Sequence, residues 1–213
     1  MIHTGPQIIE PQTLALLDQL MQDDHLTKFF LVGGTSLALQ IGHRLSIDLD
    51  LFTKNPFDSA DLNDYLVRQY NFNTTNISKN TVLGFLNGVK VDFIAHQYEL
   101  VEPLIQHEHK RLIGLLDVGA MKLNAIGQNG QRQKDFYDVY YLLERYSLSS
   151  LLEAYTVKYP RSSTLIPLRG LTYFEEIRFE LEPPMLVDSI KFEEVSNRLT
   201  QAVDEVDRVF SRS

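Results

Sequence analysis

Residues 28–52 constrain the fold more than any other stretch, because the pattern of the chain changes several times within them. An apolar run, KFFLV, precedes Gly33 and Gly34, and a helical pattern, SLALQIG, follows. The segment then becomes LSIDLDLF, where apolar and polar residues alternate with the period of a half-buried strand. We therefore predict a strand, a glycine turn, a helix capped by Thr35 or Ser36, and a second strand.

The remaining chain adds a hairpin and several helices. TVLGFL and VKVDFIA flank Asn87-Gly88, the strongest short hairpin signal in a sequence. Helical spacing covers residues 11–22, 55–70, 118–127 and 134–146, and Asp117 is placed to cap the third of these helices. The polar stretch between the hairpin and Asp117 is predicted to be a loop.

These elements predict an α+β fold with a small mixed β-sheet core flanked by helices and a helical C-terminal half. The tail after residue 146 is mostly helical in pattern, with interruptions expected at Pro160, Pro167 and Pro183-Pro184. We predict an α/β core over residues 1–110 and a helical region, packed on that core, over residues 111–213.

Composition excludes several classes of site and partner. The 213 residues include no cysteine, which removes disulfides, thiolate nucleophiles and cysteine-ligated zinc. A net charge of −8 argues against a broad nucleic-acid footprint. No apolar run approaches the roughly 20 residues that span a bilayer, and the N-terminus lacks a signal-peptide pattern. A cytoplasmic location without a membrane partner is the expectation.

Two aspartates on one predicted strand suggest a cation site. Asp48 and Asp50 leave the same face, with Cα atoms about 6.6 Å apart. Carboxylates at that separation can converge on a hard cation, or on two cations bridged by a phosphate. A third acid, Asp92, lies between apolar neighbours in VKVDFIA, where an unpaired charge is costly. If the two strands are neighbours, three carboxylates meet on one sheet face.

Each of these features also has a purely structural interpretation. The turn at Gly33 and Gly34 exposes backbone N–H groups to a phosphate, yet it equally fits a plain strand-to-helix turn. Asp48 and Asp50 could lie on a solvated strand face. Asp92 could pair with Lys90 or face water. The three features together are more specific than any one of them.

Their order resembles a known superfamily. Gly33-Gly34-Thr35-Ser36, Asp48-x-Asp50 and a later strand aspartate, Asp92, resemble the DNA polymerase β-like nucleotidyltransferases. More closely, LVGGTSLALQIGHRLSIDLDLF, VKVDFIAHQ, AMKLNAI and KDFYDVYYLL resemble the AbiEii/AbiGii-type toxin nucleotidyltransferases. The resemblance covers about residues 25–145.

The resemblance implies a nucleotidyltransferase that uses two Mg²⁺ ions and an NTP substrate. In that family pattern, Asp48 and Asp50 bind both metals, while Asp92 helps to hold the catalytic one and accepts the proton of the attacking hydroxyl. The triphosphate is held by four residues in sequence: Gly33, Gly34, Thr35 and Ser36. Such chemistry depends mainly on positioning and charge neutralisation.

Further charged residues are candidates for the same site. Arg44 could clamp a phosphate or be an exposed loop arginine. Lys122, in an apolar helical pattern, could reach solvent or a cleft. Lys134 and Asp135, with Asp138 in support, are implied by the resemblance to lie beside the nucleotide, although helix-surface ion pairs also explain them.

Other residues are predicted to be structural. His96 and the HEH of residues 107–109 are predicted to be structural or solvated rather than metal ligands. The aromatic run of Phe136, Tyr137, Tyr140 and Tyr141 is predicted to belong to the core.

The first functional hypothesis is a Mg²⁺-dependent enzyme that transfers NMP from an NTP to an acceptor. The resemblance implies a toxin of a bacterial toxin–antitoxin or phage-defence system, with an RNA such as tRNA as acceptor and an antitoxin as partner. The alternatives are a non-catalytic nucleotide-binding or interaction module, and a small-molecule nucleotidyltransferase of the antibiotic-modifying kind.

Overall fold

The computed structural model describes residues 2–181 and 183–211, which form two compact units. The first, here the sheet unit, comprises Met1–Glu99 and Pro103–Ile113. The second, here the helical unit, comprises Leu100–Glu102 and Gly114–Ser213.

The sheet unit is built on a mixed seven-stranded sheet with the order β3-β4-β5-β2-β1-β7-β6. β2 pairs in parallel with β5 and antiparallel with β1, and β1 pairs in parallel with β7. The strands are β1 (Phe30–Leu31), β2 (Leu49–Thr53), β3 (Asn73–Ser78), β4 (Thr81–Leu86), β5 (Val89–Ala95), β6 (Ile105–His107) and β7 (Lys110–Leu112).

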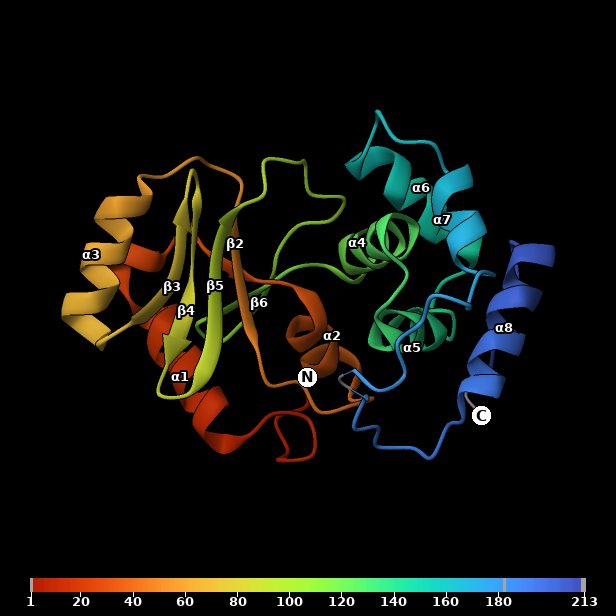
Figure 1. The fold of residues 1–213 in the computed structure, drawn as a ribbon, viewed down its shortest axis with the longest axis horizontal. Helices are drawn as coiled ribbons and strands as arrows, with labels where there is room; N and C mark the ends of the chain where they lie inside the picture. The colour runs from red at the N-terminus through yellow and green to blue at the C-terminus, as the bar shows by residue number, and fades with distance from the viewer. Residues whose placement is uncertain (1, 182, 212–213) are drawn as a thin grey trace. The chain divides into compact units, whose positions relative to one another are not determined.

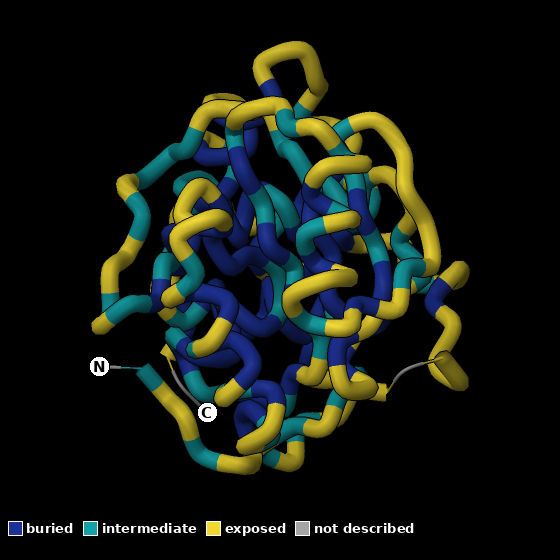
Figure 2. The backbone as a smooth tube through the Cα atoms, turned by 90° about the vertical axis from the view of Figure 1, so that its left-hand side faces the viewer, coloured by how far each residue is buried: buried dark blue, intermediate teal, exposed yellow. Residues whose placement is uncertain are grey.

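The alternation of side chains in β2 and β5 gives this sheet one core face. Leu49, Leu51, Val91 and Phe93 are at most 1% exposed and lie in the hydrophobic core. The predicted hairpin is confirmed, because β4 and β5 are joined by Asn87-Gly88 with both residues at positive φ. Figure 2, coloured by burial, shows the buried segments inside and the exposed turns outside.

The sheet unit also contains helices. The α-helices are α1 (Pro11–Gln22), α2 (Gly33–Ile41) and α3 (Ser59–Tyr70), with a short 3-10 helix, η1, at Asp24–Leu26. Figure 1 shows α3 beside β3 and β4, against which it packs. Asp58 caps α3, accepting hydrogen bonds from the backbone N–H groups of Ala60 and Asp61.

The helical unit holds the remaining helices. They are α4 (Leu115–Gln128), α5 (Gln133–Leu142), α6 (Leu148–Lys158), α7 (Leu165–Gly170) and α8 (Phe192–Asp204). The aromatic run of α5 is buried, which confirms the prediction that these rings belong to the core. An interruption of the helical pattern was predicted at Pro167. Pro167 instead lies in the first turn of α7, where no intrahelical N–H bond is required.

Two predictions about residues 96–117 are wrong. The polar stretch predicted to be a loop contains the hairpin β6–β7, whose partner strand β1 is remote in sequence. Asp117 does not cap α4, because the helix begins at Leu115. Its fully buried carboxylate instead accepts hydrogen bonds from the N–H groups of Val101 and Glu102 and pairs with Lys158.

Within the described ranges, 2–181 and 183–211, no helix combines the length and the hydropathy that crossing a membrane requires.

Candidate active site

The centre of the candidate site is a pair of aspartates on adjacent parallel strands. The register of β2 and β5 places Asp50 opposite Asp92. Because their neighbours Leu49, Leu51 and Val91 point into the core, the two carboxylates share the other face of the sheet. The condition set for a shared carboxylate face, that the two strands are neighbours, is therefore met. Asp48 lies one residue before β2 rather than inside a strand.

Lys90 neutralises part of this negative charge. Its Nζ lies 3.0 Å from Asp92 Oδ2, so the structural alternative for Asp92, pairing with Lys90, is present in the structure. Burial alone would lower the pKa of Lys90. The hydrogen bond to Asp92 and the charges of Asp92, Asp48 and Asp50 outweigh that effect and raise the pKa above its usual value. The ammonium therefore lies in the combined field of all three carboxylates.

One oxygen of Asp92 has no hydrogen-bond partner within residues 2–181 and 183–211. Asp92 is 7% exposed, and its Oδ1 is buried without a hydrogen bond among the described residues. A buried polar atom left without a partner costs roughly 1–3 kcal/mol. Such an atom is uncommon in folded proteins and calls for an explanation, for which a bound cation is one candidate.

The glycine turn lies directly against these carboxylates. Gly33 has a φ of +66°, and a Cβ built there would lie 2.6 Å from Asp50 Oδ2. A Cβ on Gly34 would collide with the Arg44 guanidinium. Both glycines therefore permit approaches that a larger residue would block. Arg44 is 3% exposed, so the alternative of an exposed loop arginine is wrong.

Thr35 and Ser36 do not cap the helix as predicted, because α2 begins two residues earlier, at Gly33. The Thr35 hydroxyl donates to the Asp48 carbonyl and lies 2.8 Å from Ser46 Oγ. Ser36 Oγ accepts a hydrogen bond from Gln40. Both residues are at most 1% exposed, so the Thr35 hydroxyl stabilises the fold around Asp48 and the Ser36 hydroxyl stabilises α2. The turn is left with the backbone N–H groups of the first turn of α2, which have no intrahelical acceptor.

A second charge cluster lies within the helical unit. Lys122 Nζ of α4 lies 2.6 Å from Asp135 Oδ1 and 2.8 Å from Asp138 Oδ2, both on α5. All three residues are at most 8% exposed. Asp135 and Asp138 are thus buried and share Lys122, rather than lying on a helix surface. Lys134 is half-buried and, with Arg132 and Gln133, lines a small cavity of about 120 Å³.

The predicted site residues therefore fall into two groups, each within one compact unit. The first contains the carboxylates, the glycine turn and Arg44, together with Lys90, which was predicted only as a possible ion-pair partner of Asp92. The signal for Lys90 was its i, i+2 spacing from Asp92 on one strand. The second group contains Lys122, Lys134, Asp135 and Asp138.

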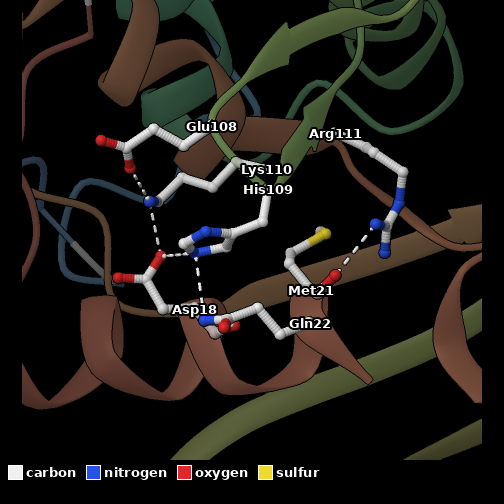
Figure 3. A network of polar contacts seen from close by, with 7 residues as sticks. All are labelled: Asp18, Met21, Gln22, Glu108, His109, Lys110 and Arg111. Carbon is white, nitrogen blue, oxygen red and sulfur yellow. Dashed lines mark hydrogen bonds and ion pairs between the residues drawn. The ribbon is translucent and has the colours of Figure 1, made fainter. Parts of the chain in front are cut away.

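His109 takes a structural position. His109 Nε2 lies 2.9 Å from Asp18 Oδ1, and Lys110 Nζ lies 2.5 Å from the same oxygen (Figure 3). The adjacent Arg111 donates to backbone carbonyls, including that of Met21 at the end of α1. These contacts fasten β7 to α1. Across residues 2–181 and 183–211, no three His, Asp or Glu side chains are already gathered into a metal-binding group.

The sequence is similar to a known family and to a known protein. Residues 15–100 match the family described as nucleotidyl transferase AbiEii toxin of the Type IV toxin–antitoxin system. The protein aq_aa25 of Aquifex aeolicus (strain VF5) is 33% identical over 163 residues, which cover 72% of this chain and 77% of that protein.

Two solved structures from Helicobacter pylori share the fold. One, described as a candidate nucleotidyltransferase, has a TM-score of 0.54 and 13% identity, with 92% of this chain and 95% of that chain covered. The other, JHP933, has a TM-score of 0.51 and 14% identity, with 93% of each chain covered. At these identities the likeness shows the fold.

Proposed function

The chain belongs to the AbiEii family of nucleotidyltransferase toxins, and from this premise we propose that it transfers a nucleoside monophosphate from an NTP to an acceptor hydroxyl. The oxygen of the acceptor attacks the α-phosphorus, the bond to the β-phosphate breaks, and pyrophosphate leaves. The single observation that carries this proposal is the juxtaposition of Asp50, Asp92 and Gly33 at one point of the sheet.

The residues of this point fit a divalent cation such as Mg²⁺. Carboxylate oxygens are the ligands that Mg²⁺ prefers. The buried Asp92 Oδ1 lacks a partner in the part of the chain that the structure describes, and the Lys90 ammonium already experiences the charge of all three aspartates. Asp48, Asp50 and Asp92 would hold the ion after Lys90 moves aside. When bound, Mg²⁺ would neutralise phosphate charge in the transition state.

The chain's own groups supply the remaining requirements. Asp92 accepts the proton of the acceptor hydroxyl. The N-terminus of α2 and the Arg44 guanidinium, which lies against Gly34, bind the phosphates that become pyrophosphate. Lys122, Lys134 and Asp135 are further proposed participants, supported by the resemblance of their sequence element to the family pattern.

The proposal also covers the acceptor and the biological role. We infer an RNA acceptor such as tRNA, and a toxin role with an antitoxin partner, from the description of the matching family as a toxin of a Type IV toxin–antitoxin system. Growth arrest on expression of the wild type, but not of Asp50→Asn, would support the toxin role. Relief of that arrest by the product of a neighbouring gene would identify the antitoxin.

One experiment tests the reaction. The protein is incubated with each α-labelled NTP, Mg²⁺ and total RNA, beside Asp48→Asn and Asp50→Asn. Label that enters RNA with the wild type alone supports the proposal. Labelling of small molecules alone would favour the antibiotic-modifying alternative, and NTP binding without any transfer would favour the binding module. Unchanged transfer by both variants would exclude the carboxylate assignment.

A further inference from the structure

The sheet face that carries the carboxylates continues into aromatic side chains. Residues two apart on a strand share a face, so Phe52 follows Asp50 on β2 and Ile94 follows Asp92 on β5. The register pairs Phe52 with Ile94 as it pairs Asp50 with Asp92. Successive rows on this face are about 6.6 Å apart. An apolar row therefore lies immediately beside the charged one.

The chain after β5 is fastened to the end of β2. The N–H of His96 donates to the Thr53 carbonyl at 2.8 Å, which continues the strand pairing by one bond. The N–H of Tyr98 donates to the His96 carbonyl at 2.8 Å and turns the chain. Lys54 Nζ lies 2.5 Å from Glu99 Oε2. These contacts hold the aromatic residues of the segment in place.

Three rings form a continuous row, here called the aromatic step: Phe52, His96 and Tyr98. The centroids of Phe52 and His96 lie 5.3 Å apart, and those of His96 and Tyr98 lie 4.6 Å apart. Tyr98 is 45% exposed, and the other two rings are half-buried. On the core face, by contrast, Leu51 and Phe93 are at most 1% exposed. The step thus keeps aromatic surface accessible beside the carboxylates.

The site has an order along β2 that matches the order of a nucleotide. Gly33 and Arg44 lie on one side of Asp50, because β1 runs antiparallel to β2 and the N–H of Val32 donates to the Asp50 carbonyl. The aromatic step lies on the other side, toward the C-terminal end of β2. A nucleotide presents phosphate, sugar and base in the same sequence.

We propose that the aromatic step binds an unpaired nucleobase by stacking, next to the carboxylates that carry nucleotidyl transfer. This inference rests on the proposed function and adds a base subsite to it. The base comes from the NTP or from the last nucleotide of the acceptor. Since every base offers a π-face, the step tolerates all four bases and favours those that stack more strongly.

A tryptophan at position 98 gives a direct test, because the chain contains no other tryptophan. Tyr98→Trp keeps a stacking ring and introduces a single indole reporter. Its fluorescence is titrated with NTPs, with a trinucleotide RNA, and with inorganic tripolyphosphate, all in the presence of Mg²⁺. The proposal predicts quenching by a ligand that carries a base and no quenching by tripolyphosphate, although tripolyphosphate binds.

Truncation gives the complementary measurement. Tyr98→Ala and Phe52→Ala are compared with Tyr173→Ala, whose ring in the helical unit is 48% exposed and serves as the matched control. Calorimetric dissociation constants for the base-containing ligand should rise about 5- to 150-fold in the two step variants, the effect of losing one stacked base. Those for tripolyphosphate should stay unchanged, and Tyr173→Ala should match the wild type throughout.

The outcomes separate the base subsite from the reaction. Weakened binding of the NTP alone assigns the step to the donor base, and weakened binding of the trinucleotide alone assigns it to the acceptor base. Equal weakening of tripolyphosphate, or no weakening of any ligand, overturns the inference. If base-dependent binding is lost as expected while the wild type transfers nothing to any acceptor, the base subsite stands and the proposed reaction fails.

Discussion

Asp50 and Asp92 stand opposite each other on the adjacent parallel strands β2 and β5. Two carboxylates in register repel each other, and the fold tolerates this pair because Lys90 is placed beside it. The unfavourable interaction in this arrangement is thus electrostatic repulsion between the carboxylates, not backbone strain. A cation that binds between the carboxylates would relieve the repulsion more completely than a flexible ammonium can.

We expect Lys90→Met to increase the affinity for divalent cations, because the cation no longer competes with the ammonium. Without a divalent cation the variant should lose about 0.2–1 kcal/mol of stability, the range for an ion pair whose lysine is half exposed. Melting temperatures with and without Mg²⁺, and Mn²⁺ binding followed by electron paramagnetic resonance, measure both effects. Lys79→Met, at an exposed turn, is the control. Weaker cation binding by Lys90→Met would contradict the competition.

We expect Gly33→Ala to abolish nucleotide transfer, because its Cβ would push into the Asp50 carboxylate. The positive φ adds strain of about 1–2 kcal/mol. Gly88→Ala is the matched control, since Gly88 also has a positive φ but no heavy atom within 4 Å of a Cβ. Both variants should lose similar stability in urea unfolding, and Gly88→Ala should retain transfer. Full transfer by Gly33→Ala would show that the turn and Asp50 are independent.

We expect Lys122→Met to destabilise the helical unit by about 3–5 kcal/mol, because it leaves Asp135 and Asp138 charged and buried. The triple variant with Asp135→Asn and Asp138→Asn should recover part of that loss. Denaturant unfolding measures the difference, and a loss below about 1 kcal/mol for the single variant would contradict the buried-pair account. Lys134→Met, at a half-buried position, should leave stability nearly unchanged while lowering transfer if Lys134 contacts the nucleotide.

We expect Tyr65→Phe to reduce stability only between the acid and alkaline extremes of pH. Burial raises the pKa of Asp23. Hydrogen bonds from Tyr65, Tyr70 and the N–H of His25 outweigh burial and hold this pKa below 3.8. Burial and the bond to Asp23 raise the pKa of Tyr65 to about 12 from 10.0.

These two pKa shifts determine how the stability of the fold depends on pH. The lowered pKa of Asp23 stabilises the fold above pH 3.8, and this contribution is lost as the pH falls further. The raised pKa of Tyr65 stabilises the fold below pH 10.0, and this contribution is lost as the pH rises toward 12. The difference in unfolding free energy between wild type and Tyr65→Phe should be constant between these limits and shrink beyond both. A difference that grows at either extreme would refute the linkage.

Local patterns predicted the parts of the fold that depend on neighbouring residues. Asn87-Gly88 predicted the β4–β5 hairpin, and the alternation around Asp50 and Asp92 predicted which side chains enter the core. The helix at residues 11–22 follows from apolar spacing alone. In each case the deciding interactions lie within a few residues of one another.

The parts that were missed depend on contacts between distant residues. β7 exists because it pairs with β1, and Lys110 is buried because Asp18 of α1 neutralises it. Asp117 has the chemistry of a helix cap, but the buried Lys158 and the N–H of Val101 draw its carboxylate elsewhere. No short-range pattern encodes such partners.

The candidate site shows the same division. The sequence placed three acids on one sheet face on the condition that the two strands are neighbours, and the structure meets that condition. The sequence did not predict that the Thr35 hydroxyl is bound to the Asp48 carbonyl, because helix starts are uncertain by one or two residues. The roles of Asp48, Asp50, Asp92, Lys134 and Asp135 stay predictions until they are measured.

The most direct test of the central claim compares two labels in one NTP. Wild type, Asp92→Asn and the exposed-surface control Asp64→Asn are each incubated with α-labelled and with γ-labelled NTP, Mg²⁺ and total RNA. We predict that the wild type and Asp64→Asn transfer the α label but not the γ label. Transfer of the α label by Asp92→Asn should be at least about 100-fold slower than by the wild type. Transfer of the γ label, or wild-type transfer by Asp92→Asn, would contradict the claim.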